Sequence, residues 1–167
     1  MQINGADDAH VVNAWQVLQG QTNVGGRVVI VEWRYDWVGL GLAELPVKRG
    51  RHVRLAVNGM VAGQNIPQYA RDTWIGTLHK LGVEIIPHVR VVRMDSEDVY
   101  FQHTLSGEPV ILKAVDTLVT AQGHLAETKR EEDLSAHRIL HHIIGDCLSP
   151  RTVEEAVLEG LRIGATL

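Results

Sequence analysis

The sequence has little of what several protein classes depend on. Cys147 is its one cysteine, which excludes an internal disulfide and any zinc or iron–sulfur site built from the cysteines of one chain. No apolar run approaches the roughly 20 residues that a membrane-spanning helix needs. Polar residues are spread through positions 1–20, Asp7 and Asp8 among them, which argues against a secretory leader. These absences predict a cytoplasmic protein that does not enter a membrane.

Neither charge nor length favours a nucleic-acid-binding protein or a large enzyme. Sixteen basic residues against 20 acidic ones give a net charge of −4, so there is no electrostatic case for a nucleic-acid partner. A length of 167 residues suits one domain with an appendage. It is too short for a (β/α)8 barrel or a complete two-nucleotide flavoenzyme, which need roughly 250 residues. A hydrophobic fraction of 45% indicates a packed core.

The first half of the chain alternates strand and helix patterns. The run 27–32 is β-branched and predicts a buried strand, and 52–57 predicts a second one. Between them, 38–49 has apolar residues at helical spacing and ends at Gly50. A strand–helix–strand unit of this size is typical of a parallel sheet with a right-handed crossover. Further elements are expected as helices at 10–19 and 67–81 and strands at 83–86 and 116–121.

The pattern changes after His88. Three short strands, at 89–94, 98–104 and 109–113, predict an antiparallel meander. Beyond the strand at 116–121, we expect an exposed connection at 125–137, a last strand at 139–144 and a helix at 151–167. The predicted fold class is therefore α/β, with a Rossmann-like parallel sheet of the FAD/NAD(P)-binding type and a three-stranded antiparallel meander.

The dinucleotide fingerprint G-x-G-x-x-G is missing from the turn where this fold would carry it. If Gly39 is its third glycine, Arg34 and Asp36 stand at the first two positions. A side chain and a carboxylate then lie where the pyrophosphate should approach the backbone. The acidic ribose ligand is also missing at the end of the second strand, where Asn58 follows Val57. We interpret this as a nucleotide-binding fold without its nucleotide; a modified site, with Arg34 on a phosphate, is the alternative.

Other chemistry-bearing residues do not form a clear motif. His137 and His141 lie four residues apart, but the strand-like pattern at 139–144 argues against a shared zinc-binding face. Cys147 precedes a helix that could activate a thiolate, yet no base accompanies it. The four tryptophans are expected to be packing anchors rather than a stacking platform, and Trp33 or Trp37 could fill the vacated nucleotide pocket.

Five segments, in order along the chain, carry a family resemblance: 23–44, 63–74, 77–88, 116–124 and 144–164. Together they resemble the C-terminal region of trimethylamine dehydrogenase-like and 2,4-dienoyl-CoA reductase-like NADH:flavin oxidoreductases. The step Ala121-Gln122-Gly123 resembles the crossover of such flavoproteins, and Gly145-Asp146 resembles their flavin-domain motif. The resemblance runs from about Gly5 to Leu167.

The resemblance implies three parts in a full-length enzyme: a barrel with FMN and a 4Fe–4S cluster, an FAD-type domain, and an inserted NAD(P)H-type domain. It places a degenerate NAD(P)-binding-like domain with its lead-in at 1–137, and a returning segment of the FAD- or ADP-binding domain at 138–167. The candidate cofactor-binding residues are then Arg34, Gly39, Gly123, Gly145 and Asp146. No catalytic residue and no metal ligand is expected, and this chain alone should bind no cofactor tightly.

We therefore expect a C-terminal nucleotide-binding-fold fragment of a trimethylamine dehydrogenase-like flavin oxidoreductase, non-catalytic alone because the redox centres lie elsewhere. The alternatives are an NAD(P)H-binding reductase domain and a stand-alone scaffold that docks on a barrel subunit. The helix at 151–167 has a broad apolar face that includes Val153, Val157 and Leu161. Since an FAD-type sheet would cover this face in the family, we expect a homo-oligomer or docking to the missing barrel and FAD-type domains.

Overall fold

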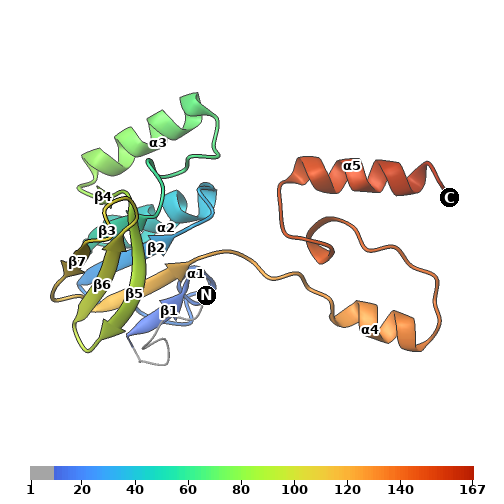
Figure 1. Ribbon diagram of the computed structural model, residues 1–167, viewed down its shortest axis with the longest axis horizontal. Helices are drawn as coiled ribbons and strands as arrows, with labels where there is room; N and C mark the ends of the chain where they lie inside the picture. Colours follow the sequence, from blue (N-terminus) through green and yellow to red (C-terminus); the bar gives the residue numbers. More distant parts are fainter. Residues whose placement is uncertain (1–9) are drawn as a thin grey trace. The chain divides into compact units, whose positions relative to one another are not determined.

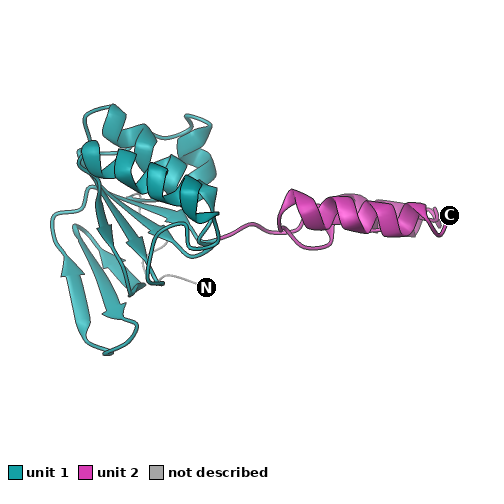
Figure 2. Cartoon of the chain, turned by 90° about the horizontal axis from the view of Figure 1, so that it is seen from above, with its two compact units in different colours: residues 1–122 teal, residues 123–167 magenta. Residues whose placement is uncertain are grey.

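The computed structural model describes residues 10–167 and divides the chain into two compact units, 1–122 and 123–167 (Figure 2). The first nine residues, including Asp7, Asp8 and the start of the resemblance at Gly5, lie outside the described part. This division falls closer to the N-terminus than the boundary that the resemblance implies after residue 137, which stays a prediction.

A parallel sheet of five strands forms the centre of the first unit, in the order β1-β8-β2-β3-β4 (Figure 1). The strands are β1 (Val11–Asn13), β2 (Arg27–Glu32), β3 (His52–Val57), β4 (Glu84–Ile86) and β8 (Thr117–Ala121). Strands β2, β3 and β8 are apolar on both faces, as expected of parallel strands that are covered on both sides. The predicted α/β fold class is confirmed.

Helices cover one face of this sheet, and the meander covers the other (Figure 2). The helices are α1 (Ala14–Leu18), α2 (Trp37–Lys48) and α3 (Gln68–Lys80). Alternate residues of β2 divide between the two faces: Val28 and Ile30 pack with the helices, whereas Val29 and Val31 pack with the meander. Two apolar clusters therefore hold the unit together, one on each side of the sheet.

The meander has the predicted antiparallel order and consists of β5 (Val89–Asp95), β6 (Asp98–His103) and β7 (Pro109–Leu112). Inward-facing Val91, Val99 and Phe101 are buried against the sheet. Outward-facing Arg90 pairs across the hairpin with Gln102. This alternation leaves polar side chains on the outer surface.

One expectation for the start of the chain is wrong. The segment predicted as a helix over 10–19 opens with β1, which pairs in parallel with β8, and only then turns into α1. Asn13 ends the strand and caps the helix, because its side chain accepts a hydrogen bond from the Gln16 N–H at 2.9 Å. A strand of three residues has too little periodicity to be distinguished from the first turn of a helix.

The second unit consists of α4 (Lys129–Ala136), a short 3-10 helix η1 (Gly145–Cys147) and α5 (Val153–Gly164). Residues 125–137, expected as a connection, therefore contain a helix. The strand predicted over 139–144 is absent: this segment has no regular structure, and Leu140 is 87% exposed. A strand needs a neighbour for its backbone hydrogen bonds, and the second unit has no described strand to supply one. None of its helices carries a buried residue.

Because both apolar clusters lie between Ala14 and Ala121, we predict that the chain shortened to residues 1–122 folds by itself. Its thermal unfolding, followed by circular dichroism, should stay cooperative with a Tm within about 5 °C of the full chain. Loss of the cooperative transition would show that residues 123–167 contribute to the core.

Candidate functional site

Ligands of open parallel sheets bind at the carboxyl ends of the strands, where neighbouring connections leave in opposite directions. In this unit β2 lies at that position, between β3 and β8. The β2–α2 loop, residues 33–36, leaves the end of β2 and turns into α2. Asp36 caps this helix, since its Oδ1 accepts a hydrogen bond from the Val38 N–H at 2.9 Å. A nucleotide-binding member of this fold would hold its pyrophosphate here.

The carboxyl group of Glu32, the last residue of β2, occupies the inside of this loop. Glu32 is only 1% exposed, and its Oε1 accepts a hydrogen bond from the backbone N–H of Tyr35. Burial raises the pKa of the Glu32 carboxyl to about 7, although hydrogen bonds from the backbone N–H groups of Tyr35, Asp36 and Arg34 act in the opposite direction. Its Oε2 is buried without a hydrogen-bond partner. The N–H groups that would meet a phosphate are thus directed at a side chain of this protein.

Gly39 allows Glu32 to lie in this position. A Cβ at residue 39 would be 2.2 Å from Cγ of Glu32, so that only a glycine permits the helix and the side chain to approach so closely. The third glycine of the dinucleotide fingerprint has the same packing role between helix and strand. The structure therefore gives Gly39 a packing role against Glu32. Its assignment as a cofactor-binding residue remains a prediction.

The other fingerprint positions are also engaged within the loop. The Nε of Arg34 donates to Oδ2 of Asp36 at 2.9 Å, so the guanidinium lies against a carboxylate. Asn65 closes the loop from the opposite side: its backbone N–H donates to the Tyr35 carbonyl at 2.9 Å, and its side chain donates to the Arg34 carbonyl at 3.1 Å. Tyr35 itself has a positive φ of 58°, which these contacts hold in place.

Trp37 does not fill the vacated nucleotide pocket, and for Trp33 the expectation stays a prediction. Its ring lies 5.5 Å from the ring of Trp74, in the groove between α2 and α3, and Trp37 remains 50% exposed. Trp74 in turn donates from its indole N–H to Glu44 at 3.2 Å. The carboxyl group of Glu32 lies on the inside of the loop, since Glu32 ends a strand whose alternation directs this residue toward α2.

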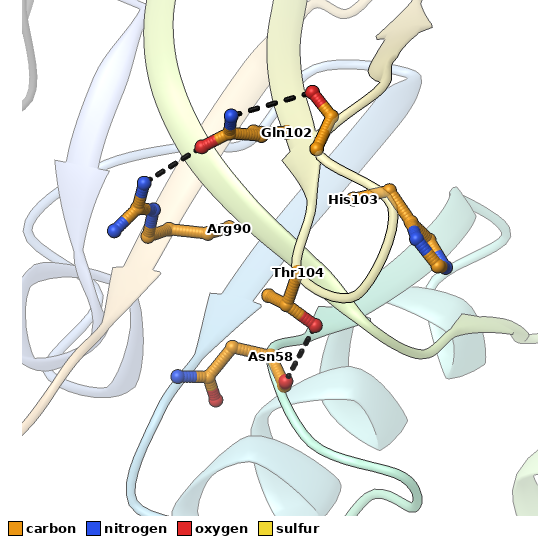
Figure 3. Close-up of a pocket in the computed structure, with 6 residues that line it drawn as sticks. Asn58, Arg90, Gln102, His103 and Thr104 are labelled. Carbon is orange, nitrogen blue, oxygen red and sulfur yellow. Dashed lines mark hydrogen bonds between the residues drawn. The ribbon is translucent and has the colours of Figure 1, made fainter.

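The edge of the sheet is more open beside β3. Asn58, which stands where an acidic ribose ligand was expected, lines a pocket of about 420 Å³ with residues of the meander (Figure 3). The other lining residues are Arg90, Gln102, His103, Thr104 and Gly107. All of these except Gly107 have polar side chains, and none is acidic. We call this cavity the Arg90 pocket.

The remaining candidate residues belong to the second unit. Gly145 has a φ of 61°, and its N–H donates to Glu159 at 2.7 Å. Asp146 is exposed and accepts a long hydrogen bond of 3.4 Å from the Arg151 N–H. Gly123 has a φ of 133°. The structure brings Arg34 and Gly39 together around Glu32, whereas Gly145 and Asp146 are simply consecutive in η1. Whether any of these residues contacts a cofactor stays a prediction.

The histidines and the cysteine form no metal centre in the described part of the chain. Within residues 10–167, no three His, Cys, Asp or Glu side chains gather closely enough to hold a metal ion. His137 contacts the carbonyl of Asp133 and His141 that of Ile139, each through Nδ1. Cys147 is exposed in η1. No helix in the same residues is long and apolar enough to cross a membrane.

Glu32 was missed when the sequence was interpreted, although a signal was present. It is a carboxylate at the end of an otherwise apolar strand, in the position before the expected glycine loop. Arg90 carried no comparable signal, because an arginine on an exposed strand face is ordinary. Its place in a pocket depends on the approach of the meander to the β3 edge.

The raised pKa of Glu32 predicts a pH-dependent stability. Between pH 4.5, the ordinary pKa of the unfolded chain, and about 7, the folded state binds the extra proton, so the free energy of unfolding should fall as pH rises through this window. Urea unfolding of the natural chain and of Glu32→Gln should differ in slope, by up to about 3 kcal/mol across the window. Glu84→Gln, at an exposed position of β4, serves as the control and should follow the natural chain. Parallel curves for all three would contradict the burial of Glu32.

The close approach of Gly39 to Glu32 gives a second prediction. Gly39→Ala should destabilise the fold by about 1–3 kcal/mol, because the new methyl group overlaps Cγ of Glu32. Gly76→Ala is the matched control, since a Cβ there meets nothing within 4 Å and α3 should gain about 0.5–1 kcal/mol. Chemical denaturation measures both changes, and a stabilised Gly39→Ala variant would exclude the packing described for Glu32.

Several solved structures have a fold similar to that of this chain. No protein-family model and no curated protein sequence matches the chain. Among solved structures, 6-hydroxypseudooxynicotine amine oxidase from Pseudomonas geniculata N1 is 22% identical, with a TM-score of 0.87 over 97% of this chain and 25% of that one. Histamine dehydrogenase from Rhizobium sp. 4-9 is 20% identical, with a TM-score of 0.79 over 94% of this chain and 26% of that one.

A third match is 2-naphthoyl-CoA reductase, which is 21% identical with a TM-score of 0.84, over 100% of this chain and 25% of that one. The chain thus spans about a quarter of the length of each of these enzymes. They comprise an amine oxidase, an amine dehydrogenase and a CoA-ester reductase, in keeping with the two branches of the sequence resemblance. At the level of fold, the resemblance of this chain to such oxidoreductases is confirmed.

Proposed function

We propose that this chain is the C-terminal nucleotide-binding-fold part of a trimethylamine dehydrogenase-like flavin oxidoreductase, and that it has no catalytic role by itself. Two independent findings support the proposal. The resembling segments follow the order of the family along nearly the whole chain, and the fold matches about a quarter of three oxidoreductases over 94–100% of this chain. FMN and a 4Fe–4S cluster would be held by a barrel outside this sequence.

Glu32 is the observation that carries the non-catalytic part of the proposal. A dinucleotide in this fold needs its pyrophosphate against the N-terminus of α2, where the buried carboxyl group of Glu32 accepts the loop hydrogen bonds. Arg34 and Asp36, which stand at the first two glycine positions of the fingerprint, form an ion pair with each other. The residues of the β2–α2 loop therefore do not fit NADH or NADPH, which argues against the reductase alternative.

The site that the resemblance implies for FAD or ADP is also engaged. The N–H of Gly145 donates to Glu159, which Arg151 contacts in turn, so this N–H is not directed at a phosphate. We propose that the second unit contributes to a nucleotide site only when the remainder of an FAD-type domain surrounds it. In this chain alone its function is docking.

Titration of the chain with NADH and NADPH by isothermal calorimetry tests the proposal. We expect no saturable binding with a Kd below about 1 mM, because the phosphate position is filled. Sub-millimolar binding of either nucleotide would overturn the non-catalytic assignment and favour an NAD(P)H-binding reductase domain.

Two sets of variants separate the effect of Glu32 on nucleotide affinity from the effect of Arg34 and Asp36. Arg34→Gly with Asp36→Gly should leave the affinity for either nucleotide unchanged, since Glu32 still fills the loop. Adding Glu32→Gly should raise it measurably, because the backbone N–H groups then become available to a phosphate. Circular dichroism of each variant controls for folding. An increase with the first pair alone would show that Glu32 is not the obstacle.

Docking is supported by the exposed apolar face of α5. Val153, Val157 and Leu161 follow one another at intervals of four residues and are 75%, 65% and 69% exposed. A capping box of Thr152 and Glu155 begins the helix, so that its ordered turns present these side chains together. Apolar side chains gathered in this way mark an interaction surface.

We predict that this face makes the isolated chain self-associate. Light scattering coupled to gel filtration should give a dimer or larger species for the natural chain, and a shift toward monomer for Val157→Ser with Leu161→Ser. Leu125→Ser, at a position that is 96% exposed but outside α5, is the control and should behave like the natural chain. A monomer at high concentration of the natural chain would contradict the prediction.

A further inference from the structure

The lining of the Arg90 pocket includes no residue of the β2–α2 loop, and the function proposed above does not explain this pocket. Its volume of about 420 Å³ falls in the range of cavities that accept small molecules. Asn58 places it at the carboxyl end of β3, the edge at which parallel sheets bind ligands. Its opposite wall comes from β5, β6 and the turn that follows, which reaches the sheet edge through a hydrogen bond from the Thr104 hydroxyl to the Asn58 carbonyl at 3.5 Å.

The side chains around the cavity are arranged mainly to donate hydrogen bonds. Arg90 and Asn58 reach toward the same side of the β5–β6 hairpin, whereas the ring of His103 points to the other side (Figure 3). His103 is engaged in its own turn, where Nδ1 accepts a hydrogen bond from the Ser106 N–H at 3.1 Å. The guanidinium of Arg90 and the side-chain N–H groups of Asn58 thus remain as donors for a ligand, whereas the Thr104 hydroxyl already donates to the Asn58 carbonyl.

Arg90 is held in place by a neutral partner. Its Nη2 donates to Oε1 of Gln102 at 2.7 Å, and Gln102 donates in turn to the Gly107 carbonyl at 3.3 Å. Elsewhere in the chain, several arginines lie against carboxylates, namely Arg27, Arg34, Arg71, Arg93 and Arg151. In the described residues no carboxylate forms an ion pair with Arg90, so its positive charge is oriented but not neutralised.

We propose that the Arg90 pocket binds a small oxyanion, either a carboxylate or a phosphate group. An oriented guanidinium offers paired N–H donors that match both groups, and the absence of an acidic side chain from the lining removes electrostatic repulsion. The side-chain N–H groups of Asn58 add hydrogen bonds to the ligand. The exposure of Arg90 gives the ligand access from solvent and limits the affinity through screening.

The experiment titrates the full chain with inorganic phosphate and, separately, with succinate, and follows the backbone amide signals by NMR. At low ionic strength we expect saturable shifts at Thr104 and Gly107 with at least one probe, and a Kd of roughly 1 mM. The probe that binds more tightly identifies the class of oxyanion. No saturable shift with either probe would overturn the proposal.

Two arginine variants on the same strand decide whether the binding is specific. Arg90→Gln should weaken it about tenfold, because the charge-assisted donors are lost. Arg93→Gln is the matched control, since Arg93 pairs with Asp95 at 2.8 Å and lies 3.8 Å above the ring of Tyr100; it should leave the affinity within about twofold. Equal losses in the two variants would reduce the effect to the net charge of the meander and overturn the proposal. Neither result depends on the nucleotide titration, so failure of one proposal is distinguishable from failure of the other.

Discussion

The burial of the Glu32 carboxyl group determines how the edge of the sheet is built. Strand β2 is apolar from Val28 to Val31, and its last residue, Glu32, points its side chain inward beneath the start of α2. The backbone of the β2–α2 loop turns its N–H groups toward the carboxyl oxygen, and Gly39 leaves room for the side chain. Asn65 then ties the loop to the connection that follows β3. The loop is therefore held by Glu32 from within the fold and by Asn65 from the following connection.

Two opposing effects act on the pKa of this carboxyl group. Burial disfavours its charged form, whereas the loop N–H groups favour it, and burial dominates. The N–H groups of the β2–α2 loop are thus directed at a side chain of the protein itself. Beside β3, where no such group is buried, the Arg90 pocket remains accessible.

The second unit is subject to a different constraint: it carries apolar side chains that it does not bury by itself. Its helices have no buried residue, and the segment before η1 has no strand partner. The ordered part of its hydrogen bonding is local: Glu159 accepts from the Gly145 N–H, and Thr152 with Glu155 forms the cap of α5. A unit of this kind is consistent with a piece of a larger domain, in agreement with a chain that spans about a quarter of the enzymes with its fold.

The sequence by itself determined the α/β class, the central strands and the meander, because long apolar strands and helical spacing are local properties of the chain. It also gives Arg34 and Asp36 at the positions where two glycines of the dinucleotide fingerprint are expected if Gly39 is the third. The prediction of a strand at 139–144 was wrong because strand pairing is not a local property: it needs a neighbouring strand, which apolar residues alone do not supply. β1 was missed since three residues pair with β8 without any pattern of their own.

Only the tertiary structure decided which side chain occupies the inside of the β2–α2 loop and where the sheet edge forms a pocket. The inward direction of Glu32 follows from the pleat of β2, but its role depends on α2 crossing directly above it, which no spacing in the sequence reveals. In the same way, Arg90 and Asn58 are far apart in the chain and share a pocket because the meander folds back to the carboxyl edge of β3. Local patterns specify the elements, whereas a site is formed by contacts between elements that are distant in sequence.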